Sequence, residues 1–480
     1  MAGVGKYLEQ HMPEFERHLS KLLAQQSVSE GARGVAECAS LLAGLLRECG
    51  FDEAEVTPTS GLPGVWGYFD AGKPHTLGVY AMFDHAVVQK PWKRAPYSPV
   101  VESVEPYGRA MFGKGVSTKG PLLVLAWALK AMRDLGMDIP VNVAFILEGE
   151  EFVGSTNYHH LVHERRDKMP GCIGAISPSA GQSATGSVSI GLGSKGCAYF
   201  ELVCEGALWG KGPVTESVHS SAQGVVHSPV WRLVEALNTL IEPGSAGLKS
   251  TLPGFYDGIR LPEGRDLELL RAIVESNKGK DWRRVVPGIA GRGRVEMLAG
   301  NLEGEDLFIR ALYYPTFNID GLRAGYINQD SPLFSLPGKA VARLDMRFAP
   351  EQRGTSLMAA LRQHLDGAGY SDIQIVDMGT HDWAVAKLED DIVQGAIRTY
   401  QDYACPMTIW PMRASGAPLG VFCSELGVPA LGGVGIGHCG SDGVDEYMVL
   451  EGNDKVAGVA QAARFLAAYL GELGRRARGD

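Results

Sequence analysis

The chain has 480 residues, of which 45% are hydrophobic and 21% are charged, and its formal net charge is -10. Two domains are expected, because this length is too great for one hydrophobic core. The negative charge argues against nucleic acid as a partner, and neither a basic tract nor a long apolar run indicates a membrane. The N-terminus lacks the apolar core of a signal peptide, and the eight cysteines include no C-x-x-C pair. Reduced thiols in a cytoplasmic protein are therefore expected.

Two helices and a strand–helix–strand unit are expected in the first third of the chain. Apolar residues recur with a helical period over residues 6–25 and 34–49. Residues 77–82 and 141–147 have the length and the β-branched or aromatic content of buried strands. Between these strands, residues 121–132 are rich in Ala and Leu and follow a glycine-rich turn, which favours a helix.

Carboxylates follow both predicted strands. Asp84 comes after the first strand, and Glu148, Glu150 and Glu151 come after the second. An open α/β sheet places its active site at the carboxyl ends of its strands. Solvated strand-end residues are the alternative, but three carboxylates within four residues favour a site.

Three motifs in this region resemble a known family, the zinc-dependent metallopeptidases that include aminoacylase, carnosinase and carboxypeptidase G. The chain reads Val79-Tyr-Ala-Met-Phe-Asp-His85, Phe112-Gly-Lys-Gly-Val-Ser-Thr-Lys-Gly-Pro121 and Glu148-Gly-Glu-Glu-Phe-Val-Gly-Ser155. The family shows Gly-His-x-Asp-Val, Tyr-Gly-Arg-Gly-x-x-Asp-Asp-Lys-Gly-Pro and Glu-Gly-x-Glu-Glu-x-Gly-Ser, in the same order and at similar spacing. Later segments extend the resemblance to nearly the whole chain.

The resemblance implies that the metal ligands are largely replaced. The family's ligand positions carry Met82, Thr118, Phe152 and Pro178 here, and only Asp442, at the last position, could bind a metal. The other four side chains offer zinc neither imidazole nor carboxylate. We therefore expect no metal and no other cofactor.

The resemblance also implies three catalytic residues. Glu151 stands at the position of the general base, and a carboxylate there suits proton transfer. Asp84 is expected to pair with His85 or to orient Glu151, with a purely structural acceptor as the alternative. His219 lies in a segment that resembles the family's lid, where a histidine reaches the active site of the other subunit and stabilises an oxyanion.

Further residues are expected to bind the substrate. Arg347 offers a planar fork for a carboxylate, with an inter-domain salt bridge as the alternative. Arg413-Ala-Ser-Gly-Ala-Pro418 resembles the family's substrate loop but is one residue shorter. A nucleophilic pair of His438 and Cys439 is disfavoured, because adjacent side chains rarely converge, and contact of His438 with the substrate is preferred. The expected substrate-binding residues are Arg347, His438, Glu150, Arg413 and His85.

An inserted domain is expected from about residue 206, where segments resembling the family's lid begin. Pro253-Gly-Phe-Tyr-Asp257 resembles the carnosinase subgroup in particular. The fold class expected from the resemblance is α/β, with a mixed-sheet catalytic domain over residues 1–205 and 385–480. Residues 206–384 should form an inserted α+β lid and dimerisation domain, which implies a homodimer.

Three functions compete. The favoured one is metal-independent general acid–base chemistry at an amide or acyl centre of a small amino-acid-like substrate, such as acyl transfer, amide formation or cyclisation, because zinc hydrolysis needs the missing ligands. The second is a zinc-dependent amidohydrolase or dipeptidase with relocated ligands. The third is a binding protein without catalysis. The relocated ligands would come from Asp84, His85, Glu150, His438 and Asp442.

Overall fold

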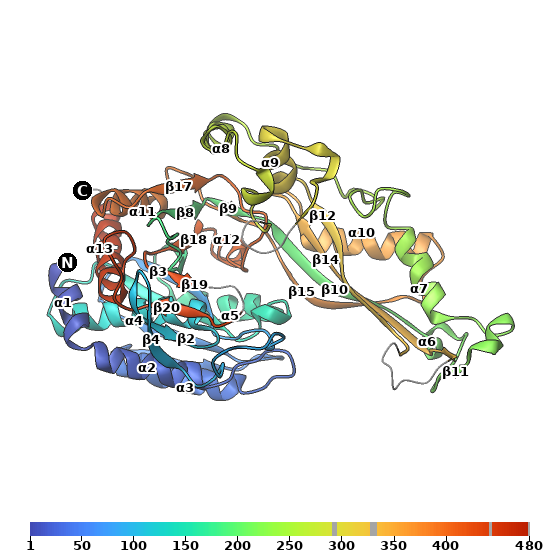
Figure 1. Ribbon diagram of the computed structural model, residues 1–480, viewed down its shortest axis with the longest axis horizontal. Helices are drawn as coiled ribbons and strands as arrows, with labels where there is room; N and C mark the ends of the chain where they lie inside the picture. Colours follow the sequence, from blue (N-terminus) through green and yellow to red (C-terminus); the bar gives the residue numbers. More distant parts are fainter. Residues whose placement is uncertain (290–294, 327–333, 441–443, 479–480) are drawn as a thin grey trace. The chain divides into compact units, whose positions relative to one another are not determined.

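Two compact units make up the chain, and the computed structural model describes residues 1–289, 295–326, 334–440 and 444–478 (Figure 1). The first unit contains Met1–Ser194, Glu263–Glu305 and Ala384–Asp480, and the second contains Lys195–Pro262 and Asp306–Trp383. Within the described part of the chain, no helix is long and apolar enough to cross a membrane.

The first unit is built on a mixed sheet of eight strands in the order β1-β2-β6-β3-β7-β18-β8-β17. β3 pairs in parallel with β6 and β7, whereas β2 pairs with β6 in the antiparallel sense. β3 and β6 are buried almost throughout, as strands with both faces covered must be. The strands are β1 (Glu53–Thr57), β2 (Gly64–Phe69), β3 (Thr76–Met82), β6 (Asn142–Glu148), β7 (Cys172–Pro178), β8 (Val188–Gly191), β17 (Met407–Trp410) and β18 (Ala430–Val434).

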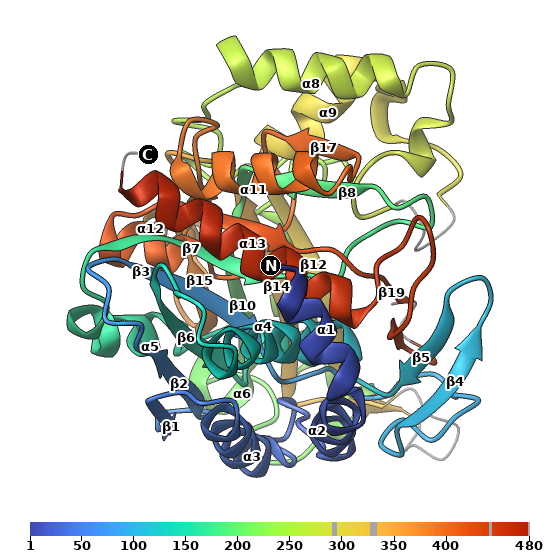
Figure 2. The same ribbon diagram turned by 90° about the vertical axis from the view of Figure 1, so that its left-hand side faces the viewer.

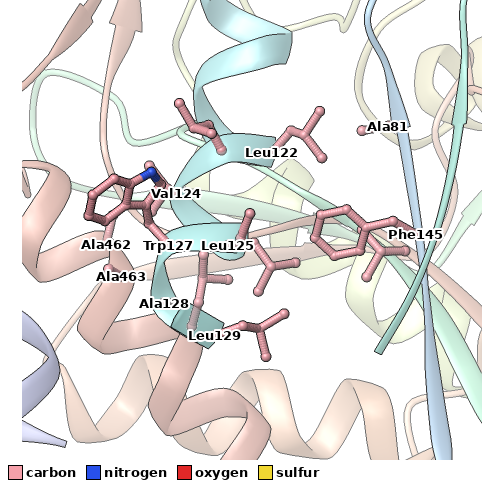
Figure 3. Close-up of a cluster of buried hydrophobic side chains, with 14 of the residues drawn as sticks. Ala81, Leu122, Val124, Leu125, Trp127, Ala128, Leu129, Phe145, Ala462 and Ala463 are labelled. Carbon is pink, nitrogen blue, oxygen red and sulfur yellow. The ribbon is translucent and has the colours of Figure 1, made fainter. Parts of the chain in front are cut away.

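Helix α4 (Val116–Asp134) lies between this sheet and the outer helices, and it is apolar nearly all round because both sides are covered. Figure 3 shows its Leu122, Leu125 and Trp127 among side chains that include Phe145 of β6 and Ala462 of α13. Figure 2 shows α1 and α13 beside each other on this side of the unit. The first unit's other helices are α1 (Ala2–Gln10), α2 (Met12–Ala24), α3 (Val35–Glu48), α5 (Tyr158–Arg165), α8 (Gly264–Ser276), α11 (Asp391–Asp402), α12 (Gly420–Leu426) and α13 (Val459–Ala477).

A smaller sheet of the first unit joins the chain's C-terminal part to the segment before α4. Its order is β19-β20-β5-β4, and β20 pairs with β5. The turn that leads into α4 therefore lies beside the segment around residue 446. The strands are β4 (Val100–Val104), β5 (Gly108–Phe112), β19 (Cys439–Gly440) and β20 (Tyr447–Val449), and a separate short pair consists of β9 (Gly193–Ser194) and β16 (Ala384–Val385).

The second unit holds an antiparallel sheet in the order β12-β14-β10-β15, against which α7 and α10 pack. Alternate residues of β10 and β14, such as Phe200 and Leu344, form its apolar core. Its elements are β10 (Gly196–Glu205), α6 (Gly206–Trp209), β11 (Val218–His219), α7 (Pro229–Asn238), β12 (Thr316–Ala324), β13 (Ser335–Leu336), β14 (Lys339–Phe348), α10 (Gly354–Gly367) and β15 (Gln374–His381). Helix α9 (Gly304–Tyr313) begins at the boundary between the units.

The expected α/β fold class with a mixed sheet is confirmed. The expected division of the chain differs from the observed one mainly in two places. Lys195–Glu205, expected in the catalytic domain, belongs to the second unit. Glu263–Glu305, expected in the inserted domain, belongs to the first unit, because α8 packs against β17.

Candidate functional site

Asp84 and the acidic turn after β6 meet at one edge of the large sheet. The parallel register places Met82 of β3 opposite Glu148 of β6, so the residues that follow both strands share this edge. Asp84 is completely buried, and its Oδ2 accepts a hydrogen bond from the Phe152 N–H at 3.1 Å. Asp84 therefore holds the short helical turn Glu151–Val153 through the backbone of Phe152.

Glu148 is a second buried acid at this edge, and its environment favours the protonated form. Its Oε1 accepts hydrogen bonds from the Tyr80 hydroxyl at 2.6 Å and the Ser155 hydroxyl at 3.1 Å. Burial, followed by the nearby charge of Asp84, raises the pKa of Glu148 well above its ordinary value. Burial also raises the pKa of Asp84 to about 6. In the described structure, Asp84 Oδ1 and Glu148 Oε2 have no hydrogen-bond partner.

Glu150 and Glu151 are adjacent but differ in their surroundings. Glu150 is 4% exposed, and its carboxylate accepts hydrogen bonds from the Asn157 N–H at 2.5 Å and the Leu62 N–H at 3.3 Å. These bonds fix the start of α5, so the structure gives Glu150 a structural role in place of the expected contact with substrate. Glu151 is half-buried at the beginning of the turn.

His85 has hydrogen-bond partners other than Asp84, unlike one of the pairings expected. Its Nδ1 lies 3.1 Å from the Ala86 carbonyl, and its Nε2 lies 3.4 Å from the Ser27 N–H. Burial, then the charge of Lys119, lowers the pKa of His85 to about 4, so the imidazole is neutral at neutral pH. The ring stacks on Tyr97 with centroids 5.4 Å apart. These contacts fit a scaffold residue better than a substrate ligand.

The lysines of the second motif also belong to the scaffold. Lys119 is completely buried and donates hydrogen bonds to the carbonyls of Leu22 and Gln25, at the C-terminal end of α2. Lys114 forms a buried ion pair with Glu446 at 2.7 Å, and Glu446 also accepts a hydrogen bond from the Gly115 N–H at 2.8 Å. Glu446 thereby holds the N-terminal end of α4.

His438 is half-buried and bonded to the chain behind it. Its Nδ1 lies 2.6 Å from the Gln182 carbonyl, and its Nε2 lies 3.5 Å from the Tyr447 hydroxyl. Burial, then the charge of Glu446, raises the pKa of Cys439 to about 12, so its thiol stays protonated. A nucleophilic pair of His438 and Cys439 is therefore unsupported. Asp442 lies outside the described residues.

Arg413 stands in the loop that resembles the substrate loop. Its Nη2 donates to the Ser189 carbonyl at 2.6 Å, while its buried Nε has no hydrogen-bond partner among the described residues. A Cβ at Gly191 would approach this Nε to 2.2 Å, so glycine makes room for the arginine. Burial lowers the pKa of Arg413.

Arg347 and His219 lie in the second unit. Arg347 pairs with Asp345 at 2.8 Å and donates to the Tyr199 hydroxyl, so its ion pair lies within that unit rather than between domains. His219 is exposed, and its Nδ1 lies 2.9 Å from the Ser221 hydroxyl and accepts a hydrogen bond from the Ser221 N–H at 3.2 Å. The structure thus gathers Asp84, Glu148 and Glu151, and it gives the remaining candidates separate partners.

The sequence reasoning missed the part played by Glu148 and Tyr80 in this cluster. From the sequence, Glu148 is an acid that follows a strand and has no assigned role, and Tyr80 is only part of a strand. The sequence feature that could have revealed this contact is the strand period of two, which places Tyr80 and Met82 on the same face of β3. The register then brings Tyr80 close to the end of β6.

A zinc site does not emerge from the described side chains. Among them, no group of three or more His, Cys, Asp or Glu residues could hold a metal ion. Asp84 is directed to the Phe152 N–H, Glu148 to Tyr80 and Ser155, and Glu150 to Asn157. These residues alone do not fit the three-ligand set that a catalytic zinc requires.

Comparison with known proteins relates the chain to peptidases. A family profile described as a peptidase dimerisation domain matches residues 206–372. The Beta-Ala-His dipeptidase of Homo sapiens is 26% identical over 349 residues, which cover 69% of this chain and 63% of the relative, less than two thirds of its length. The Cys-Gly metallodipeptidase DUG1 of Candida albicans is 23% identical over 454 residues, 88% of each chain.

Solved structures of similar proteins cover nearly the whole chain. The M20 family metallo-carboxypeptidase Sso-CP2 from Sulfolobus solfataricus has a TM-score of 0.79 and 26% identity, covering 96% of this chain and 99% of that one. Human carnosine dipeptidase 1 has a TM-score of 0.74 and 19% identity, covering 98% and 99%.

These names correct the expectation that the protein needs no cofactor. Relatives named as metallodipeptidases contradict it, and the expectation is wrong. It rested on substitutions at motif positions, which do not exclude ligands from other segments of the chain. The motifs, the mixed sheet with its antiparallel second unit, and the similar proteins together relate the chain to the M20 family of peptidases.

Proposed function

We propose that this protein is a peptidase-type enzyme that hydrolyses the amide bond of a small dipeptide-like substrate. The observation that carries the proposal is the cluster of Asp84, Glu148 and Glu151 at the carboxyl ends of β3 and β6. The relatives' names, Beta-Ala-His dipeptidase and Cys-Gly metallodipeptidase, support the dipeptidase alternative over metal-independent acyl transfer.

Glu151 moves the proton in this proposal. It accepts a proton from the attacking water, whose oxygen bonds to the amide carbon, and it returns the proton to the nitrogen as the C–N bond breaks. Asp84 positions the turn of Glu151 through the Phe152 N–H. Burial keeps Glu148 protonated, so Glu148 adds no negative charge near Glu151.

Substrate recognition is assigned to charged groups that retain bonding capacity. The buried Nε of Arg413 lacks a hydrogen-bond partner in the described structure, which supports a role in binding a carboxylate. His219 is exposed and could bind a group outside its own unit. Arg347 is already paired with Asp345, so its carboxylate-binding role is the weaker assignment.

The metal implied by the relatives' names would activate water and polarise the amide carbonyl. Because the described side chains do not fit a three-ligand site, no step of the proposal passes through an ion. Elemental analysis of the purified protein, with turnover measured before and after chelation, tests the dependence. We expect bound metal and loss of turnover on its removal. Full turnover of a metal-free protein would contradict this expectation.

Substitution of Glu151 tests the proposal itself. Glu151→Gln keeps the shape of the side chain but removes its acid–base function, so turnover of Cys-Gly or β-Ala-His should fall by roughly 10²- to 10⁴-fold. Glu164→Gln, at an exposed glutamate of α5, is the matched control and should leave turnover unchanged. Equal turnover in the parent and Glu151→Gln would reject Glu151 as the proton carrier.

We also infer that the protein forms a homodimer through the second unit. This unit is the smaller one, yet it carries most of the exposed large apolar side chains of the described chain. Most of the profile match to a peptidase dimerisation domain, residues 206–372, falls in the same unit. Exposed apolar side chains that gather in one region mark a protein interaction site more often than scattered ones do. These exposed residues include Leu208, Val214, Val225, Trp231, Val234, Leu322, Tyr326 and Phe334.

A further inference from the structure

Phe152 has an unusual environment for a phenylalanine of the first unit. Its side chain is 47% exposed. Every other phenylalanine among the described residues of this unit is buried: Phe15, Phe51, Phe69, Phe83, Phe112, Phe145, Phe422 and Phe465. An isolated exposed aromatic residue needs no explanation on an ordinary surface, but Phe152 directly follows Glu151 in the candidate site.

The turn that carries Phe152 is fixed by several hydrogen bonds. The Phe152 N–H donates to the buried Asp84 carboxylate, and the Ser155 N–H donates to the Glu150 carbonyl at 2.9 Å. The Gly154 N–H donates to the Glu151 carbonyl at 3.1 Å, and Gly154 has a φ of 111°, which favours glycine. The backbone at Phe152 is therefore constrained and does not belong to a loose loop.

Apolar surface and acidic groups occur together at this edge of the sheet. Met82, half-buried, ends β3 directly opposite Glu148 in the parallel register. Phe152 lies four residues beyond Glu148, after the end of β6. A site that joins an apolar surface to a few placed polar groups is the usual composition of a small-molecule site.

We propose that Phe152 is a specificity-determining residue that binds an apolar or aromatic side chain of the substrate beside the amide bond to be cleaved. The assignment rests on the proposed hydrolysis of a dipeptide-like substrate and adds its class. An aromatic ring packs well against aliphatic or aromatic groups. Dipeptides with a leucine or phenylalanine side chain should therefore be preferred to those built from small residues such as glycine.

Kinetics with a dipeptide panel test this assignment. The kcat and KM of parent, Phe152→Ala and Phe152→Tyr are measured for Ala-Leu, Leu-Ala, Ala-Phe and Phe-Ala, with Ala-Gly as the small substrate. We expect Phe152→Ala to lose roughly 10- to 100-fold in kcat/KM for the preferred apolar dipeptides, mainly through KM, and to keep its value for Ala-Gly. Phe152→Tyr should remain near the parent. Leu135→Ala, at an exposed leucine that follows α4, is the control and should change nothing.

Binding measurements test the assignment of Phe152 independently of the proposed hydrolysis. Calorimetric titration of parent and variants, each carrying Glu151→Gln to suppress turnover, with Ala-Leu, Leu-Ala and Ala-Gly reports affinity, and thermal melting confirms that each variant folds. A parent that binds the apolar dipeptides through Phe152 but hydrolyses none would contradict the proposed function and keep the assignment. Equal losses on Ala-Gly and the apolar dipeptides, no loss in Phe152→Ala, or a parent that binds no dipeptide would overturn it.

Discussion

Asp84 is the residue whose ionisation couples the site to the stability of the fold. Burial raises its pKa from 3.8 to about 6, so the folded protein binds this proton more tightly than the unfolded chain does. The resulting stabilisation is fully present below about pH 4 and is lost as the pH rises through about 6, a difference of about 3 kcal/mol. We expect Asp84→Asn to raise the free energy of unfolding at pH 7 and to flatten its dependence between about pH 4 and 6. Denaturant titrations at several pH values measure both effects, and an unchanged slope would contradict the pKa assignment.

The sequence predicts that Asp84 and Glu151 lie close together, but it does not distinguish the roles of the neighbouring acids. Their proximity follows from two parallel strands that end at one edge. The direction of the Glu150 side chain cannot be inferred from the period of a helix or a strand. Residues 149–155 form a turn in which Gly154 and Ser155 have positive φ. The Asn157 N–H that fixes Glu150 is known only from the fold.

Helix α4 depends at its N-terminal end on the buried pair of Lys114 and Glu446. Glu446→Gln removes the charge that Lys114 faces and weakens the acceptor of the Gly115 N–H. Removing one partner of a buried ion pair leaves the other charge uncompensated, so we expect a loss of about 3 kcal/mol in the free energy of unfolding. The exposed pair of Arg265 and Glu268 provides the control, since Glu268→Gln should cost well under about 1 kcal/mol. Equal, small losses in both variants would show that the buried pair is not needed.

The elements themselves were largely accessible from the sequence, apart from the ends of α4 and the small sheet. The expected helix over residues 121–132 begins instead at Val116, because Gly115 adopts the left-handed conformation that precedes the helix. β4 lies in a segment for which no element is expected from the sequence, because this strand is stabilised by β5 and cannot be recognised from its own polar pattern.

At the level of the whole molecule, the sequence predicts an inserted domain. It does not predict into which of the two units each segment of the insertion packs. Helix α8 buries only Leu270 and Ile273, and its amphipathic pattern would suit either unit. Its packing against β17 is a long-range contact that periodicity does not encode. The same limit explains why the expectation of no metal was wrong. Motif positions identify inherited ligands, but they do not identify ligands supplied from elsewhere in the fold.

Helix α7 gives the clearest test of the proposed homodimer. It buries Leu233 and Leu237 within its unit, yet Trp231 and Val234 remain 62% and 43% exposed. A helix that is apolar on two faces needs a second partner. We expect the parent to have twice the 51.4 kDa mass of one chain and Trp231→Glu/Val234→Glu to have the mass of one, measured by light scattering after size exclusion.

Leu135→Glu, at an exposed leucine of the first unit, is the matched control and should leave the dimer intact. Circular dichroism must show that the double variant keeps its secondary structure, since an unfolded chain would also lose its partner. If His219 acts on the other subunit, the monomeric variant should in addition lose turnover while Glu151 stays in place. A monomeric parent would refute the dimer, and an active monomer would assign catalysis to a single chain.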